Sequence, residues 1–322
     1  MRIAFVGEAL IDFTAIEGLS FEGHEGGAPA NGAIAAARLG EPTGFITQLS
    51  TDLFGERLLQ HLQRNGVDTR FVLRSDAPST LAFVERTPQT NRYAFYTQGT
   101  ADTRWAPDPL PALPDSCRYL HFGAISLLTE PAAGRITALV EAQRGQRIVL
   151  FDPNVRPSLI PDMAGYRAKL PRWIAACDLL KLSDEDAAHI APGRASGDTA
   201  ASLLASTEGP GPRAVLLTRG GEGVTLYRAG QAPIEVRPPS VQVVDTIGAG
   251  DAFAAALSVA LLAQGVEQVA QLGTLTDEAW HTVLRFAVTA AALNCTRAGA
   301  APPTRAELDA ALNHFSNKEQ KA

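Results

Sequence analysis

The stretch Val244–Phe253, with the sequence VDTIGAGDAF, decides how the rest of the chain is interpreted. In it, a short turn containing Gly248 and Gly250 runs directly into an apolar helical pattern over Ala252–Ala263. Glycines let backbone N–H groups approach a ligand closely, and a helix N-terminus adds about half a positive charge. Such a turn binds phosphate. Asp251 is unexpected for phosphate binding alone, but a carboxylate there can accept a proton beside a transferring phosphoryl group.

The same turn also fits an ordinary helix that begins after glycine and carries an acidic residue in its first turn. Other phosphate-binding patterns find no support in the sequence. The chain has no GxxxxGK[ST] segment, and Phe253 stands where a dinucleotide-binding GxGxxG needs its third glycine. The six histidines lack metal-ligand spacing and the three cysteines are scattered, so neither a zinc site nor a disulfide framework is indicated.

A second glycine-rich stretch lies early in the chain, at Gly26–Ala35, with the sequence GGAPANGAIA. It opens a helical pattern that ends at Leu39 and is followed by Gly40, a common order of residues at helix ends. Asn31 falls in the first turn of that helix, where an amide side chain is a poor helix former. From these residues alone, two interpretations stay open: Asn31 points over the glycine turn into a cleft, or it faces water.

Composition excludes several classes of protein. The 322 residues are 46% hydrophobic, enough for a sizeable core, and 28 Lys+Arg against 34 Asp+Glu give a net charge of −6. That balance argues against a general nucleic-acid-binding protein. The longest uncharged apolar run, Ala252–Val266, is shorter than the ~20 residues that span a bilayer, and the N-terminal residues have no secretory pattern. We therefore expect a cytoplasmic protein with neither a membrane nor a nucleic acid as partner.

Strand and helix patterns alternate along the chain. Buried strands are predicted at Arg2–Gly7, Thr43–Leu49, Arg118–Gly123, Arg147–Asp152, Leu179–Leu182 and Arg213–Thr218. Helices are predicted at Pro29–Leu39, Gly55–Asn65, Pro131–Arg144, Tyr166–Cys177 and Thr199–Thr207. This alternation predicts a single α/β domain over residues 1–322, with a mostly parallel sheet and helices on both faces.

Two segments interrupt this alternation, residues 12–25 and 71–105. The second contains two alternating runs, Thr80–Arg86 and Arg92–Thr97, separated by TPQTN, which predicts a β-hairpin. We expect the two segments to form a small β-rich lid within the domain, since so few strands do not fold independently. An antiparallel edge on the main sheet is the alternative.

Together, the two glycine-rich stretches resemble the two signatures of the PfkB-type (ribokinase-like) carbohydrate kinases, in the family's order and separation. Three further segments are similar to the fructokinase branch of that family: GEALIDF at Gly7–Phe13, FDPNVRP at Phe151–Pro157 and KLSDED at Lys181–Asp186. The resemblance covers essentially the whole chain. It implies a ribokinase-like three-layer sandwich with a mostly parallel central sheet and a small β lid. It also implies ATP-dependent phosphorylation of a primary hydroxyl of a ketose, fructose being converted to fructose 6-phosphate.

The resemblance implies a role for each matching residue of the substrate site. Asp251 matches the catalytic base, which takes the proton from the sugar hydroxyl. The anion hole around the transferring phosphoryl group matches Gly248, Ala249 and Gly250. Substrate contacts are implied for Asp12, Gly27, Asn31 and Arg156. Arg156 suits a charged oxygen because a guanidinium can bind it in bidentate fashion.

Nucleotide and metal contacts are implied as well, with ATP and Mg²⁺ as cofactors. The nucleotide set is Asn154, Lys181, Ser183, Thr218, Gly220, Gly223 and Asn294, with Gly299 in the loop that follows. Many relatives carry Asn-x-x-Glu where this chain has Ser183–Asp186, so the magnesium contact, largely through water, falls to Asp186 with Glu185 as a substitute. A monovalent cation such as K⁺ is a further family-level expectation, near Asp245 and Ile247.

Three alternatives remain. The first is another kinase of the same family, acting on 2-keto-3-deoxygluconate, ribose or a nucleoside. The sugar acid ranks first among these because Arg92, Tyr93 and Tyr96 of the hairpin could meet a carboxylate, and Arg92 and Tyr96 are therefore included among the substrate-binding residues. The second is a non-catalytic sugar-binding regulator, which an intact Asp251 argues against. The third is a dinucleotide oxidoreductase, disfavoured by the missing glycine. The oligomeric state stays open, with a homodimer as one alternative.

Overall fold

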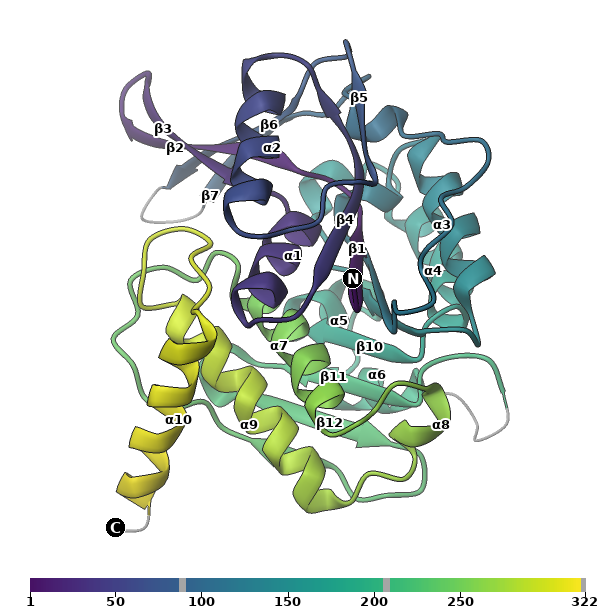
Figure 1. The fold of residues 1–322 in the computed structure, drawn as a ribbon, viewed down its shortest axis with the longest axis vertical. Coiled ribbons are helices and arrows are strands. Elements are labelled where there is room, and N and C mark those ends of the chain that lie inside the picture. The colour runs from purple at the N-terminus through teal and green to yellow at the C-terminus, as the bar shows by residue number, and fades with distance from the viewer. Residues whose placement is uncertain (87–90, 205–208, 320–322) are drawn as a thin grey trace.

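The large sheet of the computed structural model carries the candidate site at one edge (Figure 1). The structure describes residues 1–86, 91–204 and 209–319. Its strands in chain order are β1 Ile3–Val6, β4 Thr43–Ser50, β5 Val72–Ser75, β8 Tyr119–Gly123, β9 Ile148–Asp152, β10 Leu179–Ser183, β11 Ala214–Thr218, β12 Val224–Arg228 and β13 Ile234–Val236. They lie in the order β13-β12-β11-β10-β9-β8-β1-β4-β5.

The predicted mostly parallel sheet is confirmed. The pairs from β5 across to β11 are parallel, and β12 and β13 add an antiparallel end. All six predicted strands are present, with ends shifted by at most one residue. The sequence did not reveal β12 and β13, because β13 has only three residues and β12 is a short strand that a hairpin joins to β11.

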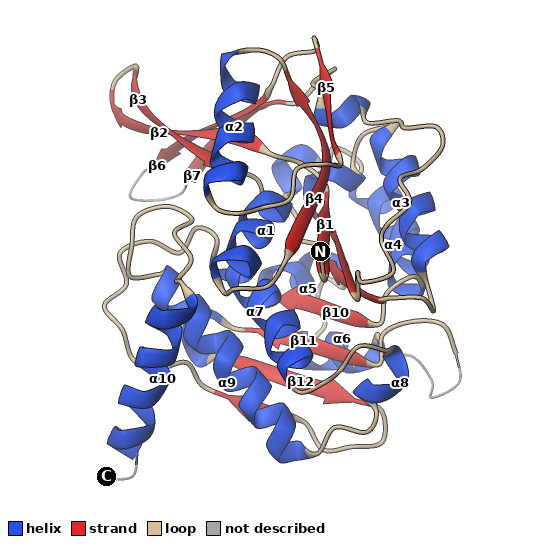
Figure 2. Cartoon of the chain, in the orientation of Figure 1, coloured by secondary structure: helices blue, strands red, loops and turns tan. Residues whose placement is uncertain are grey.

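Helices cover both faces of the sheet (Figures 1 and 2). One face packs against α1 Ala28–Arg38, α2 Leu53–Arg64, α7 Ala249–Ala263, α8 Val269–Leu272, α9 Asp277–Asn294 and α10 Arg305–Glu319. The other packs against α3 Ala132–Gln143, α4 Met163–Ala175, α5 Asp184–Ile190 and α6 Ser196–Ser202. In β1, Ile3 and Phe5 join the first core while Ala4 and Val6 join the second, as strand alternation requires. None of the described helices is long and apolar enough to cross a membrane.

The predicted helices all appear, with two differences at their ends. α4 begins three residues before the predicted start because the Asp162 side chain caps it by accepting a hydrogen bond from the N–H of Gly165. α6 spans Ser196–Ser202 rather than Thr199–Thr207, and residues 205–207 lie outside the described part of the chain.

A second, four-stranded sheet projects beside the first (Figure 2). Its strands are β2 Leu10–Glu17, β3 Ser20–Gly26, β6 Thr80–Arg86 and β7 Asn91–Tyr96, in the order β3-β2-β6-β7. β6 and β7 form the predicted hairpin, whose turn at residues 87–90 lies outside the described residues. The parallel pairing of β2 with β6 joins the two interrupting segments into one sheet, whereas β5 extends the large sheet instead.

Partly or fully buried carboxylates anchor the second sheet where the chain passes between the two sheets. Asp52 caps α2 and accepts a hydrogen bond from the Ser79 hydroxyl at 2.7 Å, just before β6. Asp102, just after β7, accepts hydrogen bonds from the hydroxyls of Thr80 at 2.5 Å and Thr100 at 2.8 Å. Asp52 thus ties the start of β6 to the segment that follows β4, and Asp102 ties the two ends of the hairpin to each other.

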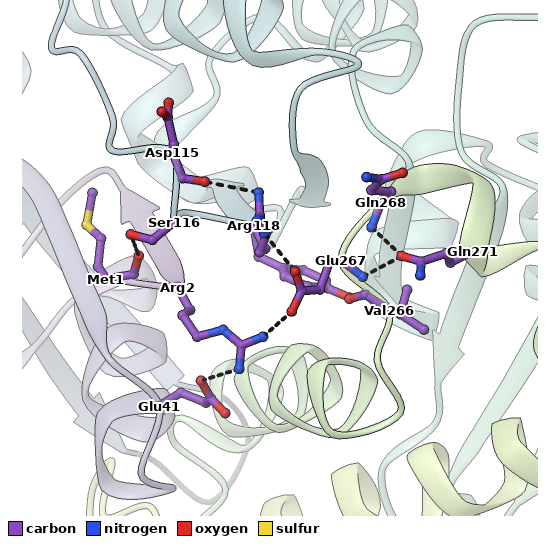
Figure 3. Close-up of polar contacts among 11 residues, drawn as sticks. Met1, Arg2, Glu41, Asp115, Ser116, Arg118, Val266, Glu267, Gln268 and Gln271 are labelled. Carbon is purple, nitrogen blue, oxygen red and sulfur yellow. Dashed lines mark hydrogen bonds and ion pairs between the residues drawn. The ribbon is translucent and has the colours of Figure 1, made fainter.

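The amino ends of β1 and β8 are tied together on the side of the sheet away from the candidate site (Figure 3). Glu267 accepts from Arg2 at 2.7 Å and from Arg118 at 2.9 Å. The hydroxyl of Tyr119 donates to the carbonyl of Val266 at 2.8 Å. The loop after α7 is thereby fixed to the sheet, which leaves the carboxyl edge of the strands as the side open to ligands.

Candidate active site

The turn before α7 has the geometry of an anion site. Gly248 precedes the helix with a φ of 75°, and a Cβ there would lie 2.7 Å from Cβ of Ala300, so only glycine fits. The helix begins at Ala249, and its first N–H groups have no partner within the helix. Asp251, the third helical residue, therefore lies at the positive end of the helix dipole. Of the N–H groups beside it, that of Ala249 donates to the Thr246 carbonyl at 3.2 Å.

Two side chains hold this turn in place. Asp245 accepts hydrogen bonds from the N–H groups of Ile247 and Gly299, both at 3.1 Å. Asn294, at the end of α9, donates to the Ile247 carbonyl at 2.7 Å and is completely buried. The Nδ2 of Asn294 thus positions the loop, while its Oδ1 has no hydrogen-bond partner among the described residues, so the expected contact with the nucleotide stays a prediction.

The early and late glycine-rich stretches meet at Asp251. The amide of Asn31 donates to Asp251 Oδ2 at 2.9 Å across 220 residues of chain, because α1 packs against α7. Asn31 thus points into the site rather than to water. Burial raises the pKa of Asp251 to about 7, aided by the charge of Asp152 and opposed by Asn31 and by the charges of Lys181 and Arg156. The carboxyl group is thus near the midpoint of its titration at neutral pH.

Lys181 and Asp152 form a buried ion pair below this turn. Lys181 Nζ lies 3.0 Å from Asp152 Oδ2, and a Cβ on Gly250 would come within 3.0 Å of the same nitrogen. Burial lowers the pKa of Lys181, but the carboxylates around it, led by Asp152, outweigh burial and raise it overall. Lys181 is only 4% exposed, so the structure gives it a carboxylate partner rather than a free charge for the nucleotide.

A cleft of about 670 Å³ opens between the second sheet and the loops around the anion site. Asp12, Asn31, Asp245, Ile247 and Gly299 are among the residues that line it, so it brings together residues predicted for sugar, cation and nucleotide. Burial raises the pKa of Asp12 to about 6, and the charges of Arg156 and His24 oppose that rise. Gly27 directly precedes α1, next to Asn31 in space and sequence.

The hairpin residues do not lie as expected. The ring of Tyr96 meets that of Phe83 at 5.7 Å, and Phe83 stacks on Phe13 at 4.9 Å. Phe13 and Asp12 are adjacent on β2, so their side chains point to opposite faces of the sheet. Tyr96 therefore lies on the face away from the cleft, and its predicted substrate contact is wrong. The side chains of residues 92–93, which include Arg92, lie outside the described part of the structure.

The strand end after β9 carries the Asn-x-Arg pair. Asn154 has a φ of 41°, unusual for a residue other than glycine, and its N–H donates to Asp152 Oδ1 at 3.2 Å. Asn154, Asp152 and Asp251 line a second, small cavity. Arg156 is exposed, and its charge lowers the pKa of Asp12, Asp152 and Asp251. It therefore lies between the sugar side and the phosphate side of the site.

Of the two residues predicted to contact Mg²⁺, Asp186 caps a helix and Glu185 lies on the surface. Asp186 is 2% exposed and forms a capping box with Ser183 at the start of α5. Its oxygens also accept the N–H of Val155 at 2.7 Å, so a direct contact with a metal ion is not available. Glu185 is exposed. Within the residues that the structure describes, no group of three or more His, Cys, Asp or Glu side chains could hold a metal ion.

In the turn after β11, one predicted nucleotide-binding glycine is exposed and the other is packed against a neighbouring strand. Gly220 is exposed, and the Thr218 hydroxyl donates to the Leu182 carbonyl at 3.2 Å. Gly223 has a φ of 97°, and a Cβ there would lie 2.1 Å from the carbonyl oxygen of Val236. Gly223 is therefore required by packing against β13, whereas Gly220 is accessible to a ligand.

Sequence reasoning missed Glu8, a carboxylate between β1 and β2. Glu8 is 2% exposed, and it accepts hydrogen bonds from both the hydroxyl and the N–H of Ser126. Burial raises its pKa to about 7, while the bond from Ser126 opposes that rise. A glutamate beside the apolar residues Ala9–Ile11 of GEALIDF was a visible signal, because charged residues are rarely buried without a partner.

Comparison with known proteins identifies relatives over nearly the whole chain. The model of the pfkB family carbohydrate kinases matches residues 1–307. A fructokinase of Rhizobium leguminosarum bv. trifolii is 38% identical over 277 residues, covering 85% of this chain and 83% of the relative. The probable fructokinase-3 of Arabidopsis thaliana is 34% identical, covering 96% of this chain and 90% of the relative.

Solved structures show the same architecture. A fructokinase with bound ATP from Xylella fastidiosa superposes with a TM-score of 0.86 at 30% identity, covering 98% of this chain and 99% of that chain. An aminoimidazole riboside kinase from Salmonella enterica, complexed with aminoimidazole riboside and an ATP analogue, gives a TM-score of 0.81 at 27% identity, covering 96% and 99%.

The raised pKa of Asp251 predicts a pH-dependent effect on stability. Because the pKa rises from 3.8 to about 7 on folding, the contribution of Asp251 to stability is present below pH 4 and is lost as pH rises through 7. Asp251→Asn removes this charge, so it should stabilise the protein by about 1–2 kcal/mol more at pH 8 than at pH 5.5. Urea unfolding at both pH values measures this, with the exposed Asp115→Asn as control; an equal effect at both pH values contradicts it.

Proposed function

The chain belongs to the pfkB family of carbohydrate kinases, and we propose that its substrates are fructose and ATP and its products fructose 6-phosphate and ADP. The observation that carries this proposal is the contact between Asn31 and Asp251, which joins the two signatures at the start of α7. Relatives named fructokinase at 34–38% identity support the choice of sugar. The ATP bound to the Xylella fructokinase supports the choice of nucleotide.

Asp251 is the base of the proposed reaction. Its carboxylate takes the proton of the sugar hydroxyl while the hydroxyl oxygen forms a bond to the γ-phosphorus and the bond to the ADP oxygen breaks. The N–H groups of Gly248 and Gly250 stabilise the charge on the phosphoryl oxygens. The N–H of Ala249, which donates to the Thr246 carbonyl, adds to the positive end of the helix dipole. These groups are fixed before the substrate arrives, because Asp245 and Asn294 hold the turn.

The cleft positions the sugar. Asp12 accepts hydrogen bonds from two neighbouring hydroxyls, and Asn31 and the turn at Gly27 hold the sugar next to Asp251. Arg156 contacts the charged oxygens, since its charge already acts on both Asp12 and Asp251. Within one domain, the four-stranded sheet of β2, β3, β6 and β7 closes as a lid, which excludes water and limits hydrolysis of ATP. β5, although part of the predicted lid segment 71–105, belongs to the large sheet.

The nucleotide lies along the carboxyl edge of the sheet. Asn154, Ser183, Thr218 and Gly220 stand at the ends of β9, β10 and β11, where open α/β sheets bind ligands. Mg²⁺ accompanies ATP as a complex with its phosphates. Because the described residues provide no protein cage for a metal ion, we assign no step to one. A monovalent cation beside Asp245 and Ile247 is part of the proposal.

The alternative sugar-acid substrate keeps only part of its support, since Tyr96 lies away from the cleft and the side chains of Arg92 and Tyr93 lie outside the described part of the structure. We further propose that the protein acts in the cytoplasm on small molecules alone. The three cysteines support this location, because all are free and none forms a disulfide. A homodimer is the proposed assembly state.

A panel of sugars tests the proposal directly. With ATP and Mg²⁺, coupled detection of ADP should give the highest kcat/KM for fructose among fructose, ribose, 2-keto-3-deoxygluconate and a nucleoside. Phosphorus NMR should identify the product as fructose 6-phosphate. A higher kcat/KM for another member of the panel overturns the choice of sugar, and no ADP above background with any sugar overturns the kinase assignment.

Asp12→Ala tests the sugar site. The variant loses charge-assisted hydrogen bonds to two hydroxyls, so KM for fructose should rise at least about tenfold while KM for ATP stays unchanged. Glu17→Ala, which removes an exposed carboxylate from the far end of β2, is the matched control and should match the wild type. An equal rise in both KM values would mean that Asp12 supports folding instead of binding sugar.

Asp251→Asn tests the base. The variant keeps size and polarity but cannot accept the proton, so kcat should fall by on the order of 10²–10⁴. The Kd for ATP, measured by calorimetry, should stay the same or decrease because a negative charge near the γ-phosphate is gone. In the wild type, kcat should rise with pH through about 7, since only the ionised carboxylate accepts a proton. A kcat within a few-fold of wild type would assign the base to another residue.

A further inference from the structure

The buried pair of Asp152 and Lys181 carries a further inference, which rests on the proposed role of Asp251 as the base. Asp152 is the last residue of β9 and Lys181 lies near the end of β10, the adjacent parallel strand. Nζ of Lys181 is 3.0 Å from one Asp152 oxygen and 3.3 Å from the other. The side chains are only 5% and 15% exposed, so little solvent screens this pair.

The pair lies directly against the catalytic turn. Lys181 Nζ occupies the space beside Gly250, the residue before Asp251, so closely that a Cβ on Gly250 would be 3.0 Å away. Asp152 lines the same cavity as Asp251. A buried cation and a buried anion thus both lie beside the turn that carries Asp251, whose carboxyl group must lose its proton before it can act as a base.

We propose that Lys181 and Asp152 are positioning residues that set the charge state of Asp251: Lys181 keeps the Asp251 carboxylate ionised, and Asp152 holds Lys181 under Gly250 while limiting its effect. The two act in opposite directions. Removing the lysine leaves Asp251 with a nearby anion and a weaker opposing cation. Removing the aspartate takes away the anion and leaves the lysine charge unopposed.

The other groups that face Asp251 do not duplicate this role. Asn31 on α1 is neutral and donates one hydrogen bond. Arg156, in the loop after β9, is exposed, so water screens its charge. Glu8, before β2, is acidic and opposes ionisation of Asp251. Asp186 acts on Lys181 as a second carboxylate, with its oxygens already bonded in the α5 cap. Lys181 is thus the buried cation among the groups that face the base.

The test is the pH dependence of kcat with both substrates saturating. The measured quantity is the pH at which kcat reaches half its maximum on the acidic side of the profile. In Lys181→Met this midpoint should shift to a pH roughly one unit higher, and in Asp152→Asn it should shift to a lower pH. KM for ATP should stay within about threefold of wild type in both. Arg228→Met is the matched control, because it removes another buried cation paired to a carboxylate, that of Asp277, at the opposite edge of the sheet. The acidic midpoint of its pH profile for kcat should equal that of the wild type.

Each other outcome overturns the proposal. If the acidic midpoint of the pH profile for kcat is unchanged in both variants, or shifts in the same direction in both, the pair does not set the charge of Asp251. If KM for ATP rises strongly in Lys181→Met while the acidic midpoint is unchanged, Lys181 is a phosphate ligand instead. If Lys181→Met fails to fold, Lys181→Gln, which keeps a polar side chain, gives the same measurement.

A second readout separates failure of this proposal from failure of the proposed function. In protein labelled with ¹³C at aspartate carboxyl groups, the Asp251 signal is identified by its loss in Asp251→Asn and titrated without substrates. Its midpoint should rise in Lys181→Met and fall in Asp152→Asn, even if none of the tested sugars is phosphorylated. Unchanged midpoints would overturn the inference while leaving the kinase assignment intact.

Discussion

A carboxylate held partly out of water at the first turn of α7 is the constraint on which the site depends. Asp251 stands at the positive end of a helix, a place suited to anions, yet burial there raises its pKa to about 7. The fold supplies an amide from α1 and a lysine from β10 against that rise. One residue is thereby kept close to the balance between acid and base that proton transfer at neutral pH needs.

The large sheet explains how groups from distant parts of the chain reach this point. Parallel strands place all their carboxyl ends on one edge, so Asp152, Ser183 and Thr218 arrive together although long helices separate them in sequence. The opposite edge is tied by Glu267 to Arg2 and Arg118. Asp52 and Asp102 anchor the hairpin of the second sheet. These contacts hold the elements around the cleft between the second sheet and the loops of the anion site.

Much of this could be predicted from the sequence, because the signals are local. Continuous apolar runs specify buried strands, glycines mark helix ends, and the two glycine-rich stretches specify the turns that meet at Asn31 and Asp251. The capping box at Ser183 and Asp186 also had a local signal, a serine followed three residues later by an acid, which was interpreted as metal binding instead.

What the sequence could not predict has a common physical cause, which is side-chain direction after folding. Tyr96 lies on the far face because strand register decides which side each residue takes, and Asn294 is turned inward to hold the Ile247 carbonyl. The pairing of Lys181 with Asp152 requires that β9 and β10 be neighbours, which no local pattern states. Sequence therefore predicted which strands and turns form the site better than which groups in it face a ligand.

A crystal structure of the protein with fructose and a non-hydrolysable ATP analogue tests the central claim most directly. The account predicts one Asp251 carboxylate oxygen within about 3 Å of the C6 hydroxyl of fructose, with the γ-phosphorus in line on the other side of that oxygen. Fructose bound with its C6 hydroxyl against a different side chain, and Asp251 beyond hydrogen-bonding reach, would contradict it.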